Sequence, residues 1–107
     1  MNTKNAVPAK EFLESLGAGP TTFASLLNTY RKCEEWTLAE MAKKLKISPS
    51  HLSDIEHGRK FVSVERAIAF AKRLKENEQY YVLIALRDEL RRANCHYEIE
   101  LKEKKIS

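Results

Sequence analysis

Apolar residues recur at intervals of three and four along most of the chain, which is the spacing of amphipathic helices. The pattern predicts five helices, at about 22–34, 37–45, 48–57, 63–74 and 78–93. A further short helix is expected over 8–16, before the break at Gly-Ala-Gly-Pro in 17–20. The chain is therefore expected to be essentially all-α.

Two of these helices, 37–45 and 48–57, lie so close in sequence that only a tight turn can join them. Thr37 stands three residues before Glu40, which is a capping box at a helix start. Ser48 followed by Pro49 starts the next helix, and Gly58 favours a left-handed end. This pattern predicts a helix-turn-helix, whose second helix can enter a DNA major groove. The expected inward residues are Leu38, Met41, Ala42, Leu45, Leu52 and Ile55.

The two following helices differ in the width of their apolar stripes. Helix 63–74 is capped by Ser63 and has one narrow apolar face. Helix 78–93 carries more apolar residues than one core face needs, and Asn94 can end it in a left-handed conformation. The expected inward residues of helix 63–74 are Val64, Ala67, Ile68, Ala71 and Leu74.

The last segment changes to a period of two, which predicts a short β-strand with one apolar face. A lone strand leaves its backbone groups unsatisfied and must pair. We expect antiparallel pairing with the same strand of a second copy, which would make the protein a homodimer. Pairing with the N-terminal residues of the same chain, or a frayed tail, is the alternative. The expected dimer contacts are Leu83, Leu86, Leu90, Tyr97, Ile99 and Leu101.

Residues 23–74 resemble the lambda-repressor/Cro-like (XRE) family of DNA-binding domains, over about half the chain. The matching motif residues are Arg31, Thr37, Met41-Ala42, Ile47-Ser48, Leu52-Ser53 and Ile55-Glu56-His57-Gly58. Two positions depart from the family pattern. Leu38 stands where the family often has a glutamine that anchors a phosphate. Lys46 stands where the family usually has glycine, so the turn is expected to be strained or rearranged.

The resemblance implies a five-helix lambda-repressor-like domain that binds double-stranded DNA. Three parts are expected: an N-terminal arm at 1–20, the helix-turn-helix domain at 21–76, and a dimerisation element at 77–107 made of a helix and a strand. The family pattern also implies an ion pair between Arg31 and Glu56 beneath the recognition helix.

The exposed side of the recognition helix is expected to read bases. Its residues are weak readers, because serine bonds to several bases, and aspartate accepts from cytosine but repels phosphates. Arginine, asparagine and glutamine, the strong readers, do not occur in 48–57. We therefore expect modest specificity, help from DNA shape, or a dimer that sums two weak half-sites. The expected base-reading residues are Pro49, Ser50, His51, Ser53 and Asp54.

Phosphate contacts are expected where helix N-termini and cations meet the DNA backbone. The helices that start at Thr37 and Ser48 each offer free N–H groups and a positive dipole end. The expected phosphate-binding residues are Thr37, Ser48, Lys43, Arg59 and Lys60. The chain has 19 Lys and Arg against 15 Asp and Glu, and the resulting charge of +4 is compatible with nucleic acid without proving it.

Cellular location is expected to be the cytoplasm, or the nucleoid when the protein is bound to DNA. Cys33 and Cys95 lie far apart in no metal-binding pattern, which is typical of reduced thiols. No stretch reaches the length of a membrane span, and the N-terminal residues lack the apolar core of a secretion signal.

Catalysis is not expected, and neither is a cofactor or a metal. Ser53, Asp54 and His57 are close in sequence, but a helix spreads them around its axis and gives no oriented triad. His51 and His57 are six residues apart, which is wrong for a shared metal on one helix face.

Three functional hypotheses follow. The first is a sequence-specific regulator of transcription, a dimeric repressor. The second is an antitoxin of a toxin–antitoxin pair, which would bind a partner protein through 1–20 or 95–107 and regulate its own operon. The third is a helix-turn-helix fold used for protein binding alone.

Overall fold

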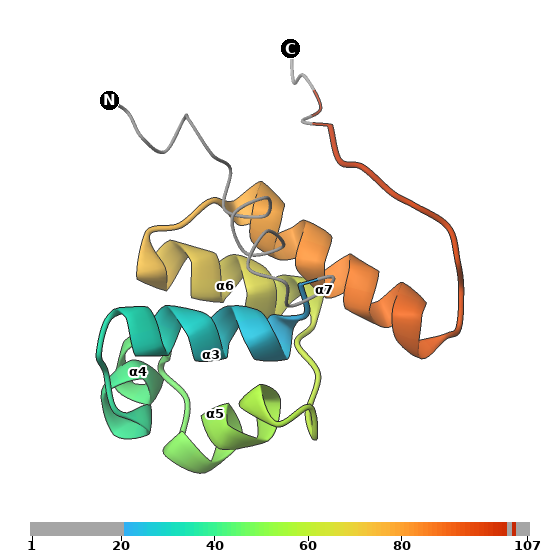
Figure 1. Ribbon diagram of the computed structural model, residues 1–107. Coiled ribbons are helices and arrows are strands. Elements are labelled where there is room, and N and C mark those ends of the chain that lie inside the picture. Colours follow the sequence, from blue (N-terminus) through green and yellow to red (C-terminus); the bar gives the residue numbers. More distant parts are fainter. Residues whose placement is uncertain (1–20, 103, 105–107) are drawn as a thin grey trace.

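Five helices make up the part of the chain that the computed structural model describes, residues 21–102 and residue 104 (Figure 1). They are α3 (Phe23–Cys33), α4 (Leu38–Leu45), α5 (Pro49–Glu56), α6 (Val64–Leu74) and α7 (Glu78–Arg92). The short helix expected over 8–16 lies outside the described residues. Within the described residues, no helix is long and apolar enough to cross a membrane.

Each helix begins at a side chain that caps it. In all five caps the side-chain oxygen accepts the backbone N–H three residues further on, which satisfies one of the free donors of the first turn. The capping box of Thr37 and Glu40 is present in full, with Thr37 N–H donating to Glu40 Oε1 over 2.8 Å. The caps are Thr22, Thr37, Ser48, Ser63 and Asn77.

Several helix ends need a left-handed backbone in the residues that follow them. Gly58 and Asn94 adopt it, with φ of 75° and 58°, as their residue types favour. Lys46 adopts it too, with φ of 61° and ψ of 42° at the C-cap of α4. The strain expected from a lysine at the usual glycine position is therefore present in the turn of the helix-turn-helix.

Replacing Lys46 by glycine is expected to stabilise the fold. A side chain in the left-handed region crowds its own backbone at a cost of about 1–2 kcal/mol, and glycine avoids this. The greater freedom of glycine in the unfolded chain offsets part of the gain, so a net increase of about 1 kcal/mol in the free energy of unfolding is expected. Urea titration measures it. Lys46→Ala is the control and should give no gain; equal results for both variants would contradict the prediction.

The core is built on three edge-to-face rings from three helices. Phe23 of α3 contacts Phe70 of α6 at 6.4 Å between ring centroids, and Tyr81 of α7 at 5.6 Å. Phe70 is fully buried, although the sequence pattern did not place it on the inward face of its helix. Val64 and Ile68, which the pattern did place there, are only half-buried. Helix α6 is therefore rotated toward Phe70 relative to the prediction.

The first and last described helices are also joined by a carboxylate. Asp88 Oδ2 of α7 accepts the backbone N–H of Phe23 over 2.9 Å, at the first residue of α3. Its other oxygen accepts from Arg91 over 2.8 Å. Asp88 therefore acts as a second cap for α3 from 65 residues away, and it fixes α7 against the start of α3.

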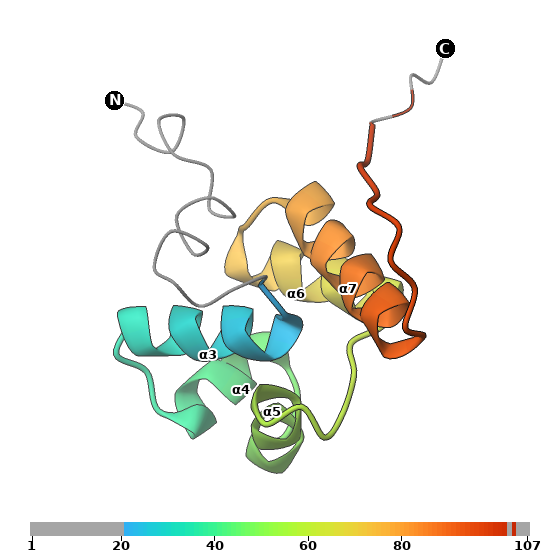
Figure 2. The same ribbon diagram turned by 45° about the vertical axis from the view of Figure 1, so that its right-hand side comes forward.

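The expected C-terminal strand does not form: residues 95–102 have no regular secondary structure. A strand needs a partner ladder, and the described part of the chain offers none. The tail instead turns back toward the start of α7, where Gln79 donates to the Leu101 carbonyl over 2.7 Å (Figure 2). The tail is long enough for this return. Helix α7 from Gln79 to its end is about 20 Å long, and residues 95–101 in extended form also span about 20 Å.

The residues expected at the dimer contact fall into two groups. Leu83, Leu86 and Leu90 of α7, together with Ile99 and Leu101 of the tail, are half-buried within the single chain. Tyr97 is 78% exposed, so it does not share one covered face with Ile99 and Leu101 as the strand pattern predicted. Their role between two copies stays a prediction.

Candidate nucleic-acid interface

Helix α4 and the turn that follows it hold α5, the predicted recognition helix, in place. Ala42 is 1% exposed, which lets the two helices approach closely. Its carbonyl accepts the backbone N–H of Ile47 over 3.0 Å and so closes α4 at the turn. Leu52 and Ile55 are buried on the inner side of α5. The opposite side of α5 faces outward.

A partly buried fork between Arg31 and Glu56 ties α5 to α3. Arg31 donates from Nε and from its NH2 group to the two carboxylate oxygens of Glu56, over 2.9 and 3.0 Å. Asn28 donates a further hydrogen bond to Glu56 over 2.9 Å. Arg31 also donates to the carbonyl of Trp36, which packs on the core just before α4. The predicted ion pair is present, and it links three segments of the helix-turn-helix unit.

Opposing influences act on the Glu56 carboxyl. Its side chain is only 3% exposed, and this burial by itself raises its pKa. The hydrogen bonds from Arg31 and Asn28, with the charge of Arg31, outweigh burial and hold the pKa of Glu56 below its ordinary value. The fork therefore stabilises the fold fully above the ordinary carboxyl pKa, and the stabilisation is lost as the pH falls through the lowered value.

The expected base-reading residues lie on the outer side of α5 with unequal exposure. Pro49 and Ser50 are exposed, while His51, Ser53 and Asp54 are half-buried. Among the described residues Ser50 forms no side-chain hydrogen bond, so its hydroxyl remains available. The other polar members are already engaged with neighbouring side chains or backbone.

Asp54 is engaged with the loop that follows α5. Its Oδ1 accepts from Arg59 Nε over 2.9 Å, and its backbone carbonyl accepts the N–H groups of Arg59 and Lys60 over 2.7 and 3.2 Å. The side chain of Arg59 is 58% exposed, against 26% for Asp54. The guanidinium is thus the outer group of the pair.

His51 is engaged with Arg66, a residue that the sequence pattern did not single out. The NH1 group of Arg66 lies 3.1 and 3.2 Å from the two ring nitrogens of His51. Burial lowers the pKa of His51, and the charges of Arg66 and Lys60 lower it further, against a smaller opposite effect of Asp54. The ring is therefore expected to be neutral near pH 7. Arg66 brings a cation from the first turn of α6 to the outer side of α5.

Replacing Arg66 by glutamine is expected to raise the pKa of His51, because it removes a neighbouring positive charge. An NMR titration of the His51 ring protons measures the shift. Lys72→Gln, at an exposed cation of the same helix, is the control and should leave the titration unchanged. In the native protein the neutral His51 ring contributes its full stability at pH values above the ordinary histidine pKa. This stability is lost as the pH falls through the lowered pKa of His51. An unaltered titration in Arg66→Gln would contradict the assignment.

Ser53 and His57 approach more closely than expected. Ser53 Oγ lies 3.4 Å from His57 Nδ1, whereas the sequence predicted only that no carboxylate would orient these two residues as a triad. The same Nδ1 lies 2.8 Å from the Ser53 carbonyl, so the histidine closes the helix end. The Asp54 carboxylate bonds to Arg59 instead of His57, and no triad is assembled. Among the described residues no three histidine, cysteine or carboxylate side chains gather as a metal site.

The predicted phosphate-binding residues Thr37, Ser48, Lys43, Arg59 and Lys60 are all exposed. The hydroxyl oxygens of Thr37 and Ser48 accept backbone N–H groups, which leaves their O–H protons free to donate. Lys44, in contrast, lies 5.0 Å from the centre of the Trp36 ring. That cation–π contact competes with a DNA contact for Lys44.

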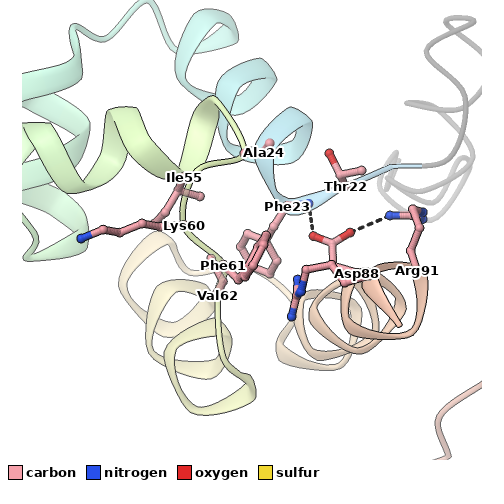
Figure 3. A pocket seen from close by; sticks show the side chains of 11 residues that line it. Thr22, Phe23, Ala24, Ile55, Lys60, Phe61, Val62, Asp88 and Arg91 are labelled. Carbon is pink, nitrogen blue, oxygen red and sulfur yellow. Dashed lines mark hydrogen bonds and ion pairs between the residues drawn. The ribbon is translucent and has the colours of Figure 1, made fainter. Parts of the chain in front are cut away.

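An apolar pocket of about 390 Å³ lies between the start of α3, the loop after α5, and the last turns of α7 (Figure 3). Phe61 lines it and is 59% exposed. The guanidinium of Arg92 lies 3.7 Å from the centre of the Phe61 ring. In Figure 3 the Lys60 side chain points away from the other labelled residues. The hydrophobic pattern gave no signal for this pocket, since a single loop phenylalanine belongs to no helical stripe.

Comparison with known families adds one match. A family model described as a helix-turn-helix domain matches residues 24–86, which is more than half of the chain. No curated protein and no solved structure matches. The matched range contains the whole unit α4–turn–α5, both partners of the Arg31–Glu56 fork, and the loop that bears Arg59. The chain belongs to the helix-turn-helix domain family.

Proposed function

We propose that this protein is a regulator of transcription that binds double-stranded DNA in a sequence-specific manner and acts as a repressor. The observation that carries the proposal is the outer side of α5, exposed between the cations Arg59 and Arg66 and anchored from below by the Arg31–Glu56 fork. A helix held in this way can lie in the major groove while the flanking cations meet the DNA backbone. Repression then needs only occupancy of an operator.

The proposal includes a homodimer, because α5 carries no arginine, asparagine or glutamine, the strong base readers. Two copies add the free energies of two half-sites, which a single weak reader cannot match. The half-buried Leu83, Leu86 and Leu90 recur on one face of α7 and support this surface as the contact. Sedimentation analysis of the free protein tests it: a monomer at the concentrations that bind DNA would contradict this part of the proposal.

Selection of bound sites from a random pool of duplex DNA, at two salt concentrations, tests the function. A dimeric reader should enrich an inverted repeat whose half-sites lie about one helical turn apart. Binding that is strongly salt-dependent but enriches nothing would indicate contacts with the backbone alone. No binding at low salt would contradict the proposed function.

The alternative function, an antitoxin that neutralises a partner protein, is favoured by the pocket beside Phe61. Large exposed aromatic residues next to an apolar hollow are typical of protein interfaces. Phe61→Ser should then weaken partner binding and leave DNA binding intact, since Lys60, the lining residue that is expected to meet a phosphate, points its side chain away from the other labelled pocket residues. Loss of DNA binding in Phe61→Ser, measured on folded protein, would count against a separate partner site.

A further inference from the structure

We propose that Asp54 is a positioning residue that holds the guanidinium of Arg59 for a DNA phosphate, and that it does not read a base. The inference rests on the proposed DNA-binding function and assigns separate roles to Asp54 and Arg59 within that site. It replaces the expectation that Asp54 accepts a hydrogen bond from cytosine.

The backbone after α5 brings Arg59 over Asp54. Helix α5 ends at Glu56, and Gly58 with φ of 75° reverses the chain direction. The N–H groups of Arg59 and Lys60 then both return to the carbonyl of Asp54. This loop is closed by backbone groups, so it does not depend on the Asp54 side chain.

The side chain of Asp54 adds a constraint that the backbone does not supply. Its Oδ1 lies 2.9 Å from Nε of Arg59, and among the described residues this is the only hydrogen bond that the guanidinium makes. Both terminal amino groups of Arg59 are therefore available. A guanidinium that is fixed through Nε can offer those two groups together to the oxygens of one phosphate.

The exposure of the two side chains decides which of them DNA meets. The side chain of Arg59 is 58% exposed and that of Asp54 is 26% exposed, so the positive group is the more accessible of the two. An uncovered carboxylate at this place would repel phosphates, whereas the pair presents a cation on its outer side. Exposed ion pairs contribute little to folding stability. The expected effect of this pair is to order a flexible arginine before binding, which lowers the entropy lost in the complex.

The test is a double-mutant cycle on DNA binding, with Asp54→Ala, Arg59→Ala and the double variant measured on the selected operator at two salt concentrations. Arg59→Ala should weaken DNA binding about tenfold. It should also reduce the slope of log binding constant against log salt concentration by about one, the loss of one phosphate contact. At the higher salt, where general charge effects are screened, Asp54→Ala should weaken binding about threefold. In the Arg59→Ala background, Asp54→Ala should not weaken DNA binding, because no arginine remains to be held.

Other results would overturn the inference. Equal weakening by Asp54→Ala in both backgrounds, or a changed preference at one base pair in the selection, would make Asp54 an independent base reader. Lys43→Ala, at an exposed cation of α4, is the matched control and should show no coupling to Asp54→Ala. Thermal melts of all variants confirm that each is folded.

A second measurement needs no DNA. The Nε–H signal of Arg59 should be observable by NMR in the wild-type protein at neutral pH and should broaden through solvent exchange in Asp54→Ala. An unchanged signal would overturn the positioning role even if DNA binding is confirmed. Absence of DNA binding by the wild-type protein would overturn the proposed function, and this inference with it.

Discussion

Replacing Arg31 by methionine is expected to lower the free energy of unfolding by about 3 kcal/mol, the lower end of the usual cost of leaving one member of a buried ion pair alone, because the Arg31 side chain is 18% exposed. Methionine keeps the aliphatic stem but removes the charge. The Glu56 side chain is 3% exposed, and among the described residues it would keep only Asn28 as a hydrogen-bond donor. Urea titration at pH 7 measures the loss.

The pH dependence of this loss has a definite sign. Burial without Arg31 should raise the pKa of Glu56 above its ordinary value, whereas in the wild type the pKa lies below it. In Arg31→Met, protonation of Glu56 therefore removes the unpaired charge and reduces the loss of stability. The difference in stability between wild type and Arg31→Met should shrink as the pH falls toward 4. A difference that stays constant with pH would show that lost packing, and not an unpaired charge, is the cause.

The double variant Arg31→Met with Glu56→Gln separates the two causes further. It leaves no isolated charge beneath α5, so it should be more stable than Arg31→Met alone. A double variant that is less stable than the single one would indicate that the carboxylate has a partner other than Arg31 of equal importance.

Replacing Phe70 by alanine is the second change with a large expected effect. The ring is fully buried against Phe23 of α3, and its removal should cost about 3–5 kcal/mol, as it does for other buried phenylalanines. Small domains have only about 5–15 kcal/mol of stability, so the variant should be close to unfolding at 37 °C. A thermal melt followed by circular dichroism measures the shift of the midpoint.

Phe70→Leu is the matched control, because leucine fills much of the same volume and should lose far less stability. Val64→Ala on the same helix tests the orientation of α6: Val64 is half-buried and should be much less sensitive than Phe70. Equal losses for Phe70→Ala and Val64→Ala would mean that the helix presents the face that the sequence pattern predicted.

The local features of this fold were predictable from sequence because each depends on neighbouring residues. The caps Thr37 and Ser48 bond to N–H groups three residues away, and Gly58 and Lys46 adopt left-handed conformations at helix ends. The Arg31–Glu56 pair was anticipated only through the family resemblance, since nothing local links residues 25 positions apart.

The features that sequence analysis missed depend on tertiary contacts. Asp88 caps α3 from 65 residues away, and Arg66 reaches His51 from the next helix. The hydrogen bond of Asp54 to Arg59 was not expected either, because the loop that returns Arg59 to it is not visible in a helical pattern. The predicted C-terminal strand was wrong because alternation describes which sides of a chain are apolar, and it does not supply the ladder that a strand requires.

Trp36 is the only tryptophan of the chain, and its place beside the Arg31–Glu56 fork makes it a natural optical reporter. Its ring lies 6.0 Å from that of Tyr30, and its carbonyl accepts from Arg31. The emission of Trp36 should therefore respond to events at the junction of α3 and α4, without an attached dye. Fluorescence would follow the anchoring of α5 to α3, while circular dichroism follows all five described helices. A disagreement between the two signals during unfolding would reveal the recognition unit loosening before the rest of the protein.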